Sequence, residues 1–289
     1  MTDPSPMPSP EDSARQEASA RQERTRWIDA LREAGLAHHL DALAPLVRTA
    51  IAVHPREVSG PDHRVGASRL GGTPDLPAEL PWPADAGGPL PFIAQFDLAV
   101  LAAFDVDHLL PHRGLLAFFG GWGEDGDRGT VLHVREGRLA PRVAPAGVDT
   151  EVVQGVDFAL RVELPPHTSR FVAIDAPTAT HYAVDPHTRE VAPLPPPAVS
   201  LHVADHVRYA DVYNHARGTY GRGQHGLLGY GRAMEGALRP DEVLLLRLDA
   251  DGTIEHPFHE AAVLYFLIDR AALARNDFSA ARFWYGASI

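Results

Sequence analysis

A series of short apolar runs, beginning near residue 49 and continuing to the C-terminus, constrains the fold of this chain more than any other feature. Clusters of Gly, Pro and Asp separate the runs, as is typical of strands joined by turns. Helical patterns interrupt them near 98–109, 200–216 and 270–275. Because strands do not alternate regularly with crossover helices, we expect an α+β fold with mainly antiparallel sheets. The runs are TAIAVHP, PFIAQFDL, GLLAFFGG, TVLHV, VDFALRVELP, SRFVAID, EVLLLRLD and AVLYFLID.

The N-terminal residues differ in texture from the rest of the chain. Residues 1–22 are rich in Pro, Ser and charge, and we expect a disordered tail there, because little apolar surface offsets the ordering entropy. From Thr25 to Leu46, apolar side chains recur near helical spacing, with Gly35 as a break, which predicts a helical hairpin or a bent helix. We therefore expect a tail over 1–22 and a single domain over 23–289.

Two parts of this domain resemble each other. When PFIAQFDL is aligned with VLLLRLDA, Asp97 and Asp249 coincide at a separation of 249 − 97 = 152 residues. In the runs that follow, Phe118 and Phe266 match at 266 − 118 = 148. Either the domain contains an internal duplication, with halves at about 49–175 and 199–289, or two strand pairs rich in Leu and Phe are alike by composition.

Composition excludes several classes of function. The chain of 289 residues has no cysteine, and all 26 of its basic residues are arginine, against 38 acidic residues and a net charge of −12. It therefore has no disulfide, thiolate nucleophile or Schiff-base lysine, and the lack of cysteine fits a cytoplasmic location. We expect no nucleic-acid partner, because the net charge repels phosphate. We expect no export or membrane insertion, because we find neither a signal-peptide pattern nor an apolar run of about 18–20 residues.

The segment GRGQHG, residues 221–226, has the G-x-G-x-x-G spacing of a dinucleotide-binding loop. That loop requires a preceding strand and a following helix. Here a helical pattern precedes it, with Ser200 as a candidate N-cap and Gly218 as its end, and Gly229 and Gly231 follow. We therefore interpret the segment as a loop and expect no cofactor.

Metal and nucleophile patterns are incomplete. His202 and His206 lie at i, i+4, and HPFHE (256–260) carries two further histidines, but H-E-x-x-H is absent. We expect no metal site. The chain has no G-x-S-x-G elbow, although Ser68 with His225 and an aspartate is conceivable as a nucleophilic set.

Two further groups of residues are candidates for a binding site. Gln95 and Asp97 share a face of one strand and could line a pocket, or Asp97 could cap a helix that begins at Leu98. The stretch SRLGGTPDLPAELPWP could hold a small anion beside Arg69, or it could be a structural lid.

The blocks GASRLGGTPDLPAELPWP, PLPFIAQFDLAVL, LLPHRGLLAFFGG, QHGLLGY, LLLRLDADG and AVLYFLIDRAALARNDFS resemble, in order and spacing, those of the YwqG-like family of bacterial cytoplasmic proteins. The resemblance extends from about Ile51 to the C-terminus. It implies a cytoplasmic α+β protein with an internal duplication, and no particular activity, because the family is a domain of unknown function.

The chain departs from that family at several positions. Arg69 stands where the family usually has lysine, and Glu260 is the nearest substitute for a glycine-aspartate pair before the last strand run. Met234 and Glu235 occupy a region where glutamine is common. A ligand shared by relatives would be bound differently here.

These observations lead us to expect an intracellular module that binds a protein partner or a small molecule. The alternative is an enzyme, a hydrolase or a pathway-specific catalyst, with a cleft around Arg69, Gln95, Asp97 and His225. A pocket uniting these four side chains would favour the enzyme, and separate internal hydrogen bonds would favour the binding module. The candidate ligand-binding residues are Ser68, Arg69, Gln95, Asp97, His225, Asp249 and Glu260.

Overall fold

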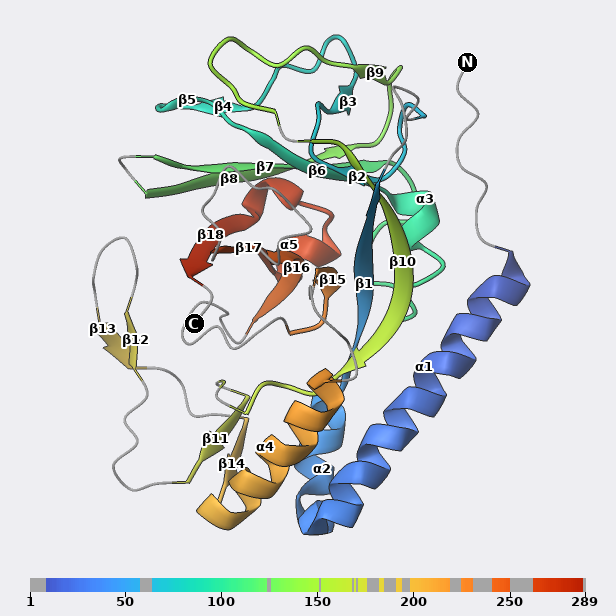
Figure 1. Ribbon diagram of the computed structural model, residues 1–289, viewed down its shortest axis with the longest axis vertical. Coiled ribbons are helices and arrows are strands. Elements are labelled where there is room, and N and C mark those ends of the chain that lie inside the picture. The colour runs from blue at the N-terminus through green and yellow to red at the C-terminus, as the bar shows by residue number, and fades with distance from the viewer. Residues whose placement is uncertain are drawn as a thin grey trace.

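A large antiparallel sheet, curved almost into a barrel, forms the centre of the fold in the computed structural model (Figure 1). Its ten strands lie in the order β18-β17-β16-β15-β1-β10-β2-β6-β7-β8. The structure describes residues 9–57, 64–123, 126–150, 152–167, 169, 171–175, 182–184, 191–193, 198–218, 225–230, 241–249 and 262–287. The strands of this sheet are β1 (Arg48–Glu57), β2 (Arg69–Leu70), β6 (Phe92–Asp97), β7 (Leu115–Gly123), β8 (Gly126–Val134), β10 (Gln154–Glu163), β15 (Gly226–Leu228), β16 (Glu242–Asp249), β17 (Ala262–Asp269) and β18 (Arg282–Ala287).

The two edge strands of the sheet meet, which is why the shape approaches a barrel. A Cβ placed on Gly129 of β8 would lie 2.3 Å from the Cβ of Phe283 on β18. Each of the ten strands contributes to one apolar core on the concave face, and alternate residues of β7 show the period of two expected for a strand, with Leu116 and Phe118 facing this core. The predicted α+β class with a mainly antiparallel sheet is thus confirmed at this level.

Shorter strands and helices lie around the sheet (Figure 1). Beside β6 and β7 lie the pairs β3 (Asp75–Leu76) with β9 (Ala140–Pro141) and β4 (Ala84–Asp85) with β5 (Gly88–Pro89). Elsewhere β11 (Val172–Ile174) pairs in parallel with β14 (Val199–Leu201), and β12 (Tyr182–Val184) pairs with β13 (Val191–Pro193). The α-helices are α1 (Pro10–Leu31), α2 (Leu40–Leu43), α3 (Leu98–Leu101), α4 (Val203–Gly218) and α5 (Arg270–Ala274). No helix in the described ranges has the length and apolar character needed to cross a membrane.

The N-terminal segment differs from the expected tail over 1–22. Among those residues, Pro10 to Gln22 belong to α1, whose first turn is capped by Ser9 and carries Glu11 and Asp12. These are favourable features for a helix N-terminus, and the Ala, Glu, Gln and Arg that follow have high helix propensity. Intrinsic helix signals therefore outweighed the low apolar content on which the tail was predicted.

The chain bends after α1, as the glycine in the sequence predicted. Gly35 has φ of 82° inside the irregular turn Arg32–Leu36, a left-handed conformation that glycine adopts without strain. A short 3₁₀ turn, Ala37–His39, leads into α2, and another, Ala44–Leu46, leads into β1. Leu36 and Leu43 then pack with Trp27 of α1 and Tyr209 of α4 in a second core.

Helix α4 begins two residues later than an N-cap at Ser200 predicted. Ser200 belongs to β14, where it pairs with Ala173 of β11. The helix starts at Val203 and ends at Gly218, and it buries the face formed by His206, Tyr209, Tyr213 and Ala216. Ser200 therefore forms part of a strand pair and does not cap the helix, although its residue type predicted that it would.

Candidate functional site

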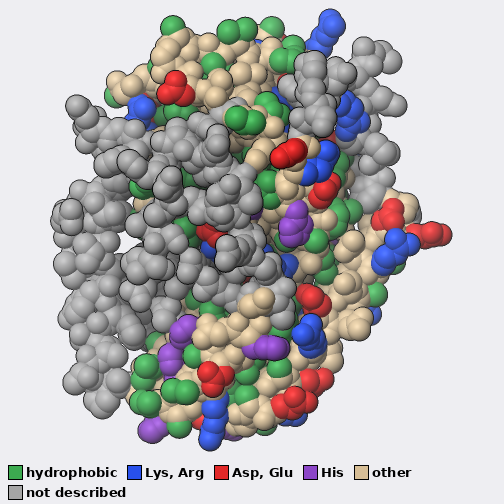
Figure 2. Space-filling model, viewed as in Figure 1, with side chains coloured by type: hydrophobic (Ala, Val, Ile, Leu, Met, Phe, Trp, Pro, Cys, Tyr) green, Lys and Arg blue, Asp and Glu red, His purple; other side chains and the backbone are tan. Residues whose placement is uncertain are grey.

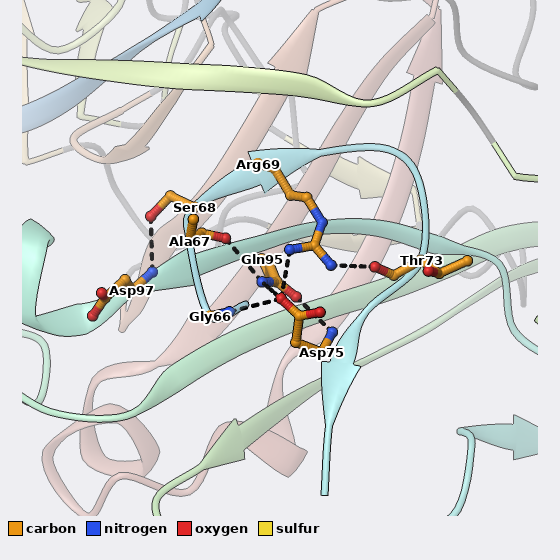
Figure 3. Close-up of polar contacts among 8 residues, drawn as sticks. All are labelled: Gly66, Ala67, Ser68, Arg69, Thr73, Asp75, Gln95 and Asp97. Carbon is orange, nitrogen blue, oxygen red and sulfur yellow. Dashed lines mark hydrogen bonds and ion pairs between the residues drawn. The ribbon is translucent and has the colours of Figure 1, made fainter. Parts of the chain in front are cut away.

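A buried polar cluster joins Arg69, Asp75 and Gln95 between β2, β3 and β6 (Figure 3). Nη1 of Arg69 donates to Oδ2 of Asp75 at 2.6 Å, and Nε2 of Gln95 donates to the same oxygen at 2.9 Å. Oε1 of Gln95 accepts from the backbone N–H of Asp75 at 2.9 Å. All three residues are buried, with Arg69 exposing 1% of its surface and the other two 0%. The cluster is therefore sealed from solvent.

The same cluster anchors the glycine-rich segment around it. The Arg69 guanidinium also donates to the carbonyl of Thr73, and Oδ2 of Asp75 accepts from the backbone N–H of Gly66 at 2.8 Å. Gln95 donates to the carbonyl of Ala67 at 2.8 Å. These bonds hold both ends of the segment on β6, so the lid interpretation of this stretch agrees with its geometry better than an exposed anion cradle does.

Electrostatics keep Asp75 ionised inside the cluster. Burial acts to raise the pKa of Asp75, but the hydrogen bond and positive charge of Arg69, with the donors Gly66 and Gln95, outweigh it, so that the pKa lies below its usual value. The ion pair is therefore part of the fold itself. Sequence reasoning missed Asp75, although an aspartate six residues after an arginine in a Gly-Gly turn was a readable signal.

Ser68 and Asp97 meet beside this cluster (Figure 3). The Ser68 hydroxyl accepts from the backbone N–H of Asp97 at 2.9 Å. The Asp97 side chain accepts from the backbone N–H of Ala99 at 3.0 Å and caps α3. The capping interpretation of Asp97 is therefore confirmed.

His225, directly before β15, and Asp249 of β16 form a second arrangement. Nδ1 of His225 accepts from the backbone N–H of Asp249 at 3.0 Å, and His225 is 1% exposed. The Asp249 carboxylate accepts from Arg247, with Nη2 at 2.7 and 2.6 Å from its two oxygens. Gly226 enters a strand and not a helix, which agrees with rejecting the dinucleotide-binding loop; residues 221–224 lie outside the described residues.

The two arrangements correspond at several positions. Ser68 and His225, 225 − 68 = 157 apart, each accept the backbone N–H of the aspartate in the neighbouring long strand. Gly71 and Gly72 have φ of 65° and 71°, and Leu228 and Gly229, also 157 residues later, have φ of 63° and 76°. Aligning SRLGG with HGLLG could have revealed this match from the sequence.

The longer strands repeat the correspondence. In β6 and β7, Gln95 pairs with Ala117, and in β16 and β17, Arg247 pairs with Tyr265, at the separations of 152 and 148 residues found in the sequence. Each ladder has one irregularity, between Phe92 and Ala94 in the first and at the matching position, between Leu244 and Leu246, in the second.

The structure does not unite all the predicted site residues. Ser68, Arg69, Gln95 and Asp97 lie on or next to the neighbouring strands β2 and β6. His225 and Asp249 lie next to β15 and on β16, and β1 and β10 separate these strands from β2 in the sheet. Glu260, like His256 and His259, lies outside the described residues. The residues that are described divide between two similar, internally hydrogen-bonded arrangements.

The structure also gives different surroundings to His202 and His206, which the sequence places on one helical face. His206 is buried, and its Nε2 lies 2.6 Å from the carbonyl oxygen of His167, while His202 is exposed. A different set of metal-ligating side chains comes together: Nε2 of His38 and Nε2 of His39 lie 3.0 and 3.1 Å from Oδ2 of Asp205. Sequence reasoning missed this group because about 166 residues separate its members.

Comparison with known proteins places the chain in a family. No curated protein sequence is significantly similar to it. The family model described as a domain of unknown function, DUF1963, matches residues 68–286, which contain both arrangements described above. The chain therefore belongs to the DUF1963 family, a domain of unknown function.

Proposed function

We propose that this protein is a protein-binding module and not an enzyme. The observation that supports this proposal is the burial and hydrogen bonding of the four side chains that were expected to form a cleft. Arg69, Gln95 and His225 are at most 1% exposed, and Asp97 caps a helix. Each is held in hydrogen bonds of the fold, so the groups that would perform acid-base or nucleophilic chemistry support backbone segments.

The surface that we propose for the partner is the exposed side of α4. Val203 and Val207 are 54% and 55% exposed, and at i, i+4 they lie on one face of the helix, outside its buried face. His202 and Asp211, both exposed, border this pair. Exposed apolar side chains with a polar border are typical of protein contact surfaces.

The test uses the full chain as bait. Chemical crosslinking in the source cells, followed by mass spectrometry, should capture the same partner with wild type and with Val143→Asp. Val143 is 91% exposed and lies in the segment after β9, so it serves as a matched control. The double variant Val203→Asp/Val207→Asp should reduce capture by about tenfold, since losing an apolar anchor costs more than about 1 kcal/mol. Equal capture by the double variant would contradict the proposal.

We propose further that the chain is a YwqG-like protein of the cytoplasm, built by duplication from halves at about 49–175 and 199–289. The absence of cysteine supports the location. The matching strand registers, irregularities and left-handed residues of the two arrangements support the duplication. In the sheet, β1 of the first proposed half lies next to β15 of the second half, so the two halves form one continuous sheet.

A further inference from the structure

His38, His39 and Asp205 bring three metal-ligating atoms together at one end of the molecule. The two histidines lie in the turn Ala37–His39, and Asp205 lies in the first turn of α4. Their Nε2, Nε2 and Oδ2 atoms are all within 4.8 Å of one another. Figure 2 shows histidine side chains at the end of the molecule where Figure 1 places α2 and α4.

We propose that these residues form a zinc site. Zinc bonds of about 2.0–2.1 Å in a tetrahedron place neighbouring ligand atoms about 3.3 Å apart. The Asp205 oxygen lies 3.0 and 3.1 Å from the two histidine nitrogens, within a few tenths of an ångström of that spacing. Two imidazoles with one carboxylate suit zinc, whereas magnesium and calcium prefer oxygen ligands alone.

The surrounding structure holds the ligands in place before metal binds. Leu36, two residues before His38, is 0% exposed, and Tyr209 of α4 is also 0% exposed in the same core. Nη1 of Arg208 donates to Oδ1 of Asp205 at 3.0 Å, which orients the carboxylate with Oδ2 toward the histidines. Such an outer contact commonly fixes a metal-ligating carboxylate.

One side of the site is open to solvent. The His38 side chain is 58% exposed, whereas those of His39 and Asp205 are 23% and 14% exposed. Three protein ligands leave a fourth tetrahedral position, and this exposure gives water access to it. The site is therefore suited to an exchangeable ion more than to a closed structural one.

Zinc titration of the purified, metal-free full chain tests the proposal. Competition against a chromophoric chelator should show one tight site per chain, and cobalt should give the intense visible bands of tetrahedral coordination. His39→Ala and Asp205→Ala should each weaken zinc binding by at least about tenfold, and Arg208→Gln should weaken it by about 10–100-fold, as loss of an outer contact does.

His202→Ala is the matched control, because His202 is an exposed histidine three residues from Asp205 that lies outside the group. It should bind zinc as wild type does. The chain has 16 histidines, so adventitious binding would appear as several weak sites that His202→Ala and His39→Ala reduce equally. That outcome, or unchanged affinity in His39→Ala with a native circular dichroism spectrum, would overturn the proposal.

Discussion

At the scale of single residues, the polar side chains of this protein act mainly on backbone. Ser68 and His225 accept from aspartate amides, and Asp97 accepts from an amide in the first turn of α3. Buried polar groups cost free energy unless they are paired, and these pairs fix the ends of strands and the start of a helix. Their removal should therefore first be visible as lost stability.

His225→Ala should lower the free energy of unfolding by about 1–3 kcal/mol, because the amide of Asp249 would lose its buried acceptor. Denaturant melts of the variant and wild type measure this. An unchanged midpoint would show that the imidazole is not a tether.

Asp75→Asn should change how stability depends on pH. The pKa of Asp75 is lowered in the folded protein, so ionised Asp75 stabilises the fold above the unfolded-state value of about 3.9, and this contribution is lost as pH falls through the lower folded value. Wild type should therefore lose stability below about pH 4, and the variant should lose less over the same range. At neutral pH the variant should be destabilised by about 3–5 kcal/mol, because Arg69 keeps a buried charge.

Denaturant melts at pH 7, 4 and 3 test both parts of this expectation. Asp157→Asn is the control, because its side chain is 71% exposed. Equal pH slopes in Asp75→Asn and wild type would contradict the assigned role of the ion pair.

At the scale of elements, α1 covers a strand edge that the sheet leaves largely unpaired. Strand β10 pairs with β1 along its full length, but with β2 only at Gln154 and Gly155. The carboxylate of Glu23 in α1 accepts from the backbone N–H of Val162 on β10 at 3.1 Å. Covering an edge in this way satisfies its backbone and blocks pairing with other chains.

Glu23→Ala should therefore destabilise the protein by about 1.5–3 kcal/mol, the range for a hydrogen bond to a charged group. Glu17→Ala is the matched control on the same helix, because its contact with Arg21 is exposed, and it should change stability by less than about 0.5 kcal/mol. Hydrogen exchange at Val162 should accelerate only in Glu23→Ala; similar exchange in both variants would show that α1 does not protect the edge.

At the scale of the whole molecule, the strand pair β6 and β7 and the strand pair β16 and β17 contribute to one core. The rings of Phe118 on β7 and Phe266 on β17 pack edge to face with centroids 5.0 Å apart, and both residues are fully buried. These are the phenylalanines that matched in the sequence at a separation of 148 residues. The strands that carry them belong to one concave surface, so the core depends on both strand pairs at once.

Phe118→Ala and Phe266→Ala should each cost about 3–5 kcal/mol. The double variant should cost less than the sum by about 0.5–1.5 kcal/mol, which is the coupling expected of an aromatic pair. Chemical denaturation of the four proteins measures the coupling, with Phe278→Ala paired with Phe118→Ala as a second cycle for comparison. Strict additivity of Phe118 and Phe266 would contradict their direct contribution to joining the strand pairs.

The sequence by itself determined the strands, the bend at Gly35, the cap at Asp97 and the antiparallel class, because these depend on local periodicity, backbone freedom and the side chain nearest each turn. Tertiary structure decided the order of strands in the sheet and which polar groups meet. Gln95 donates to Asp75 from another strand, and Asp205 contacts His38 and His39 far along the chain. Such contacts depend on how elements pack in space, and spacing along the chain carries no record of that packing.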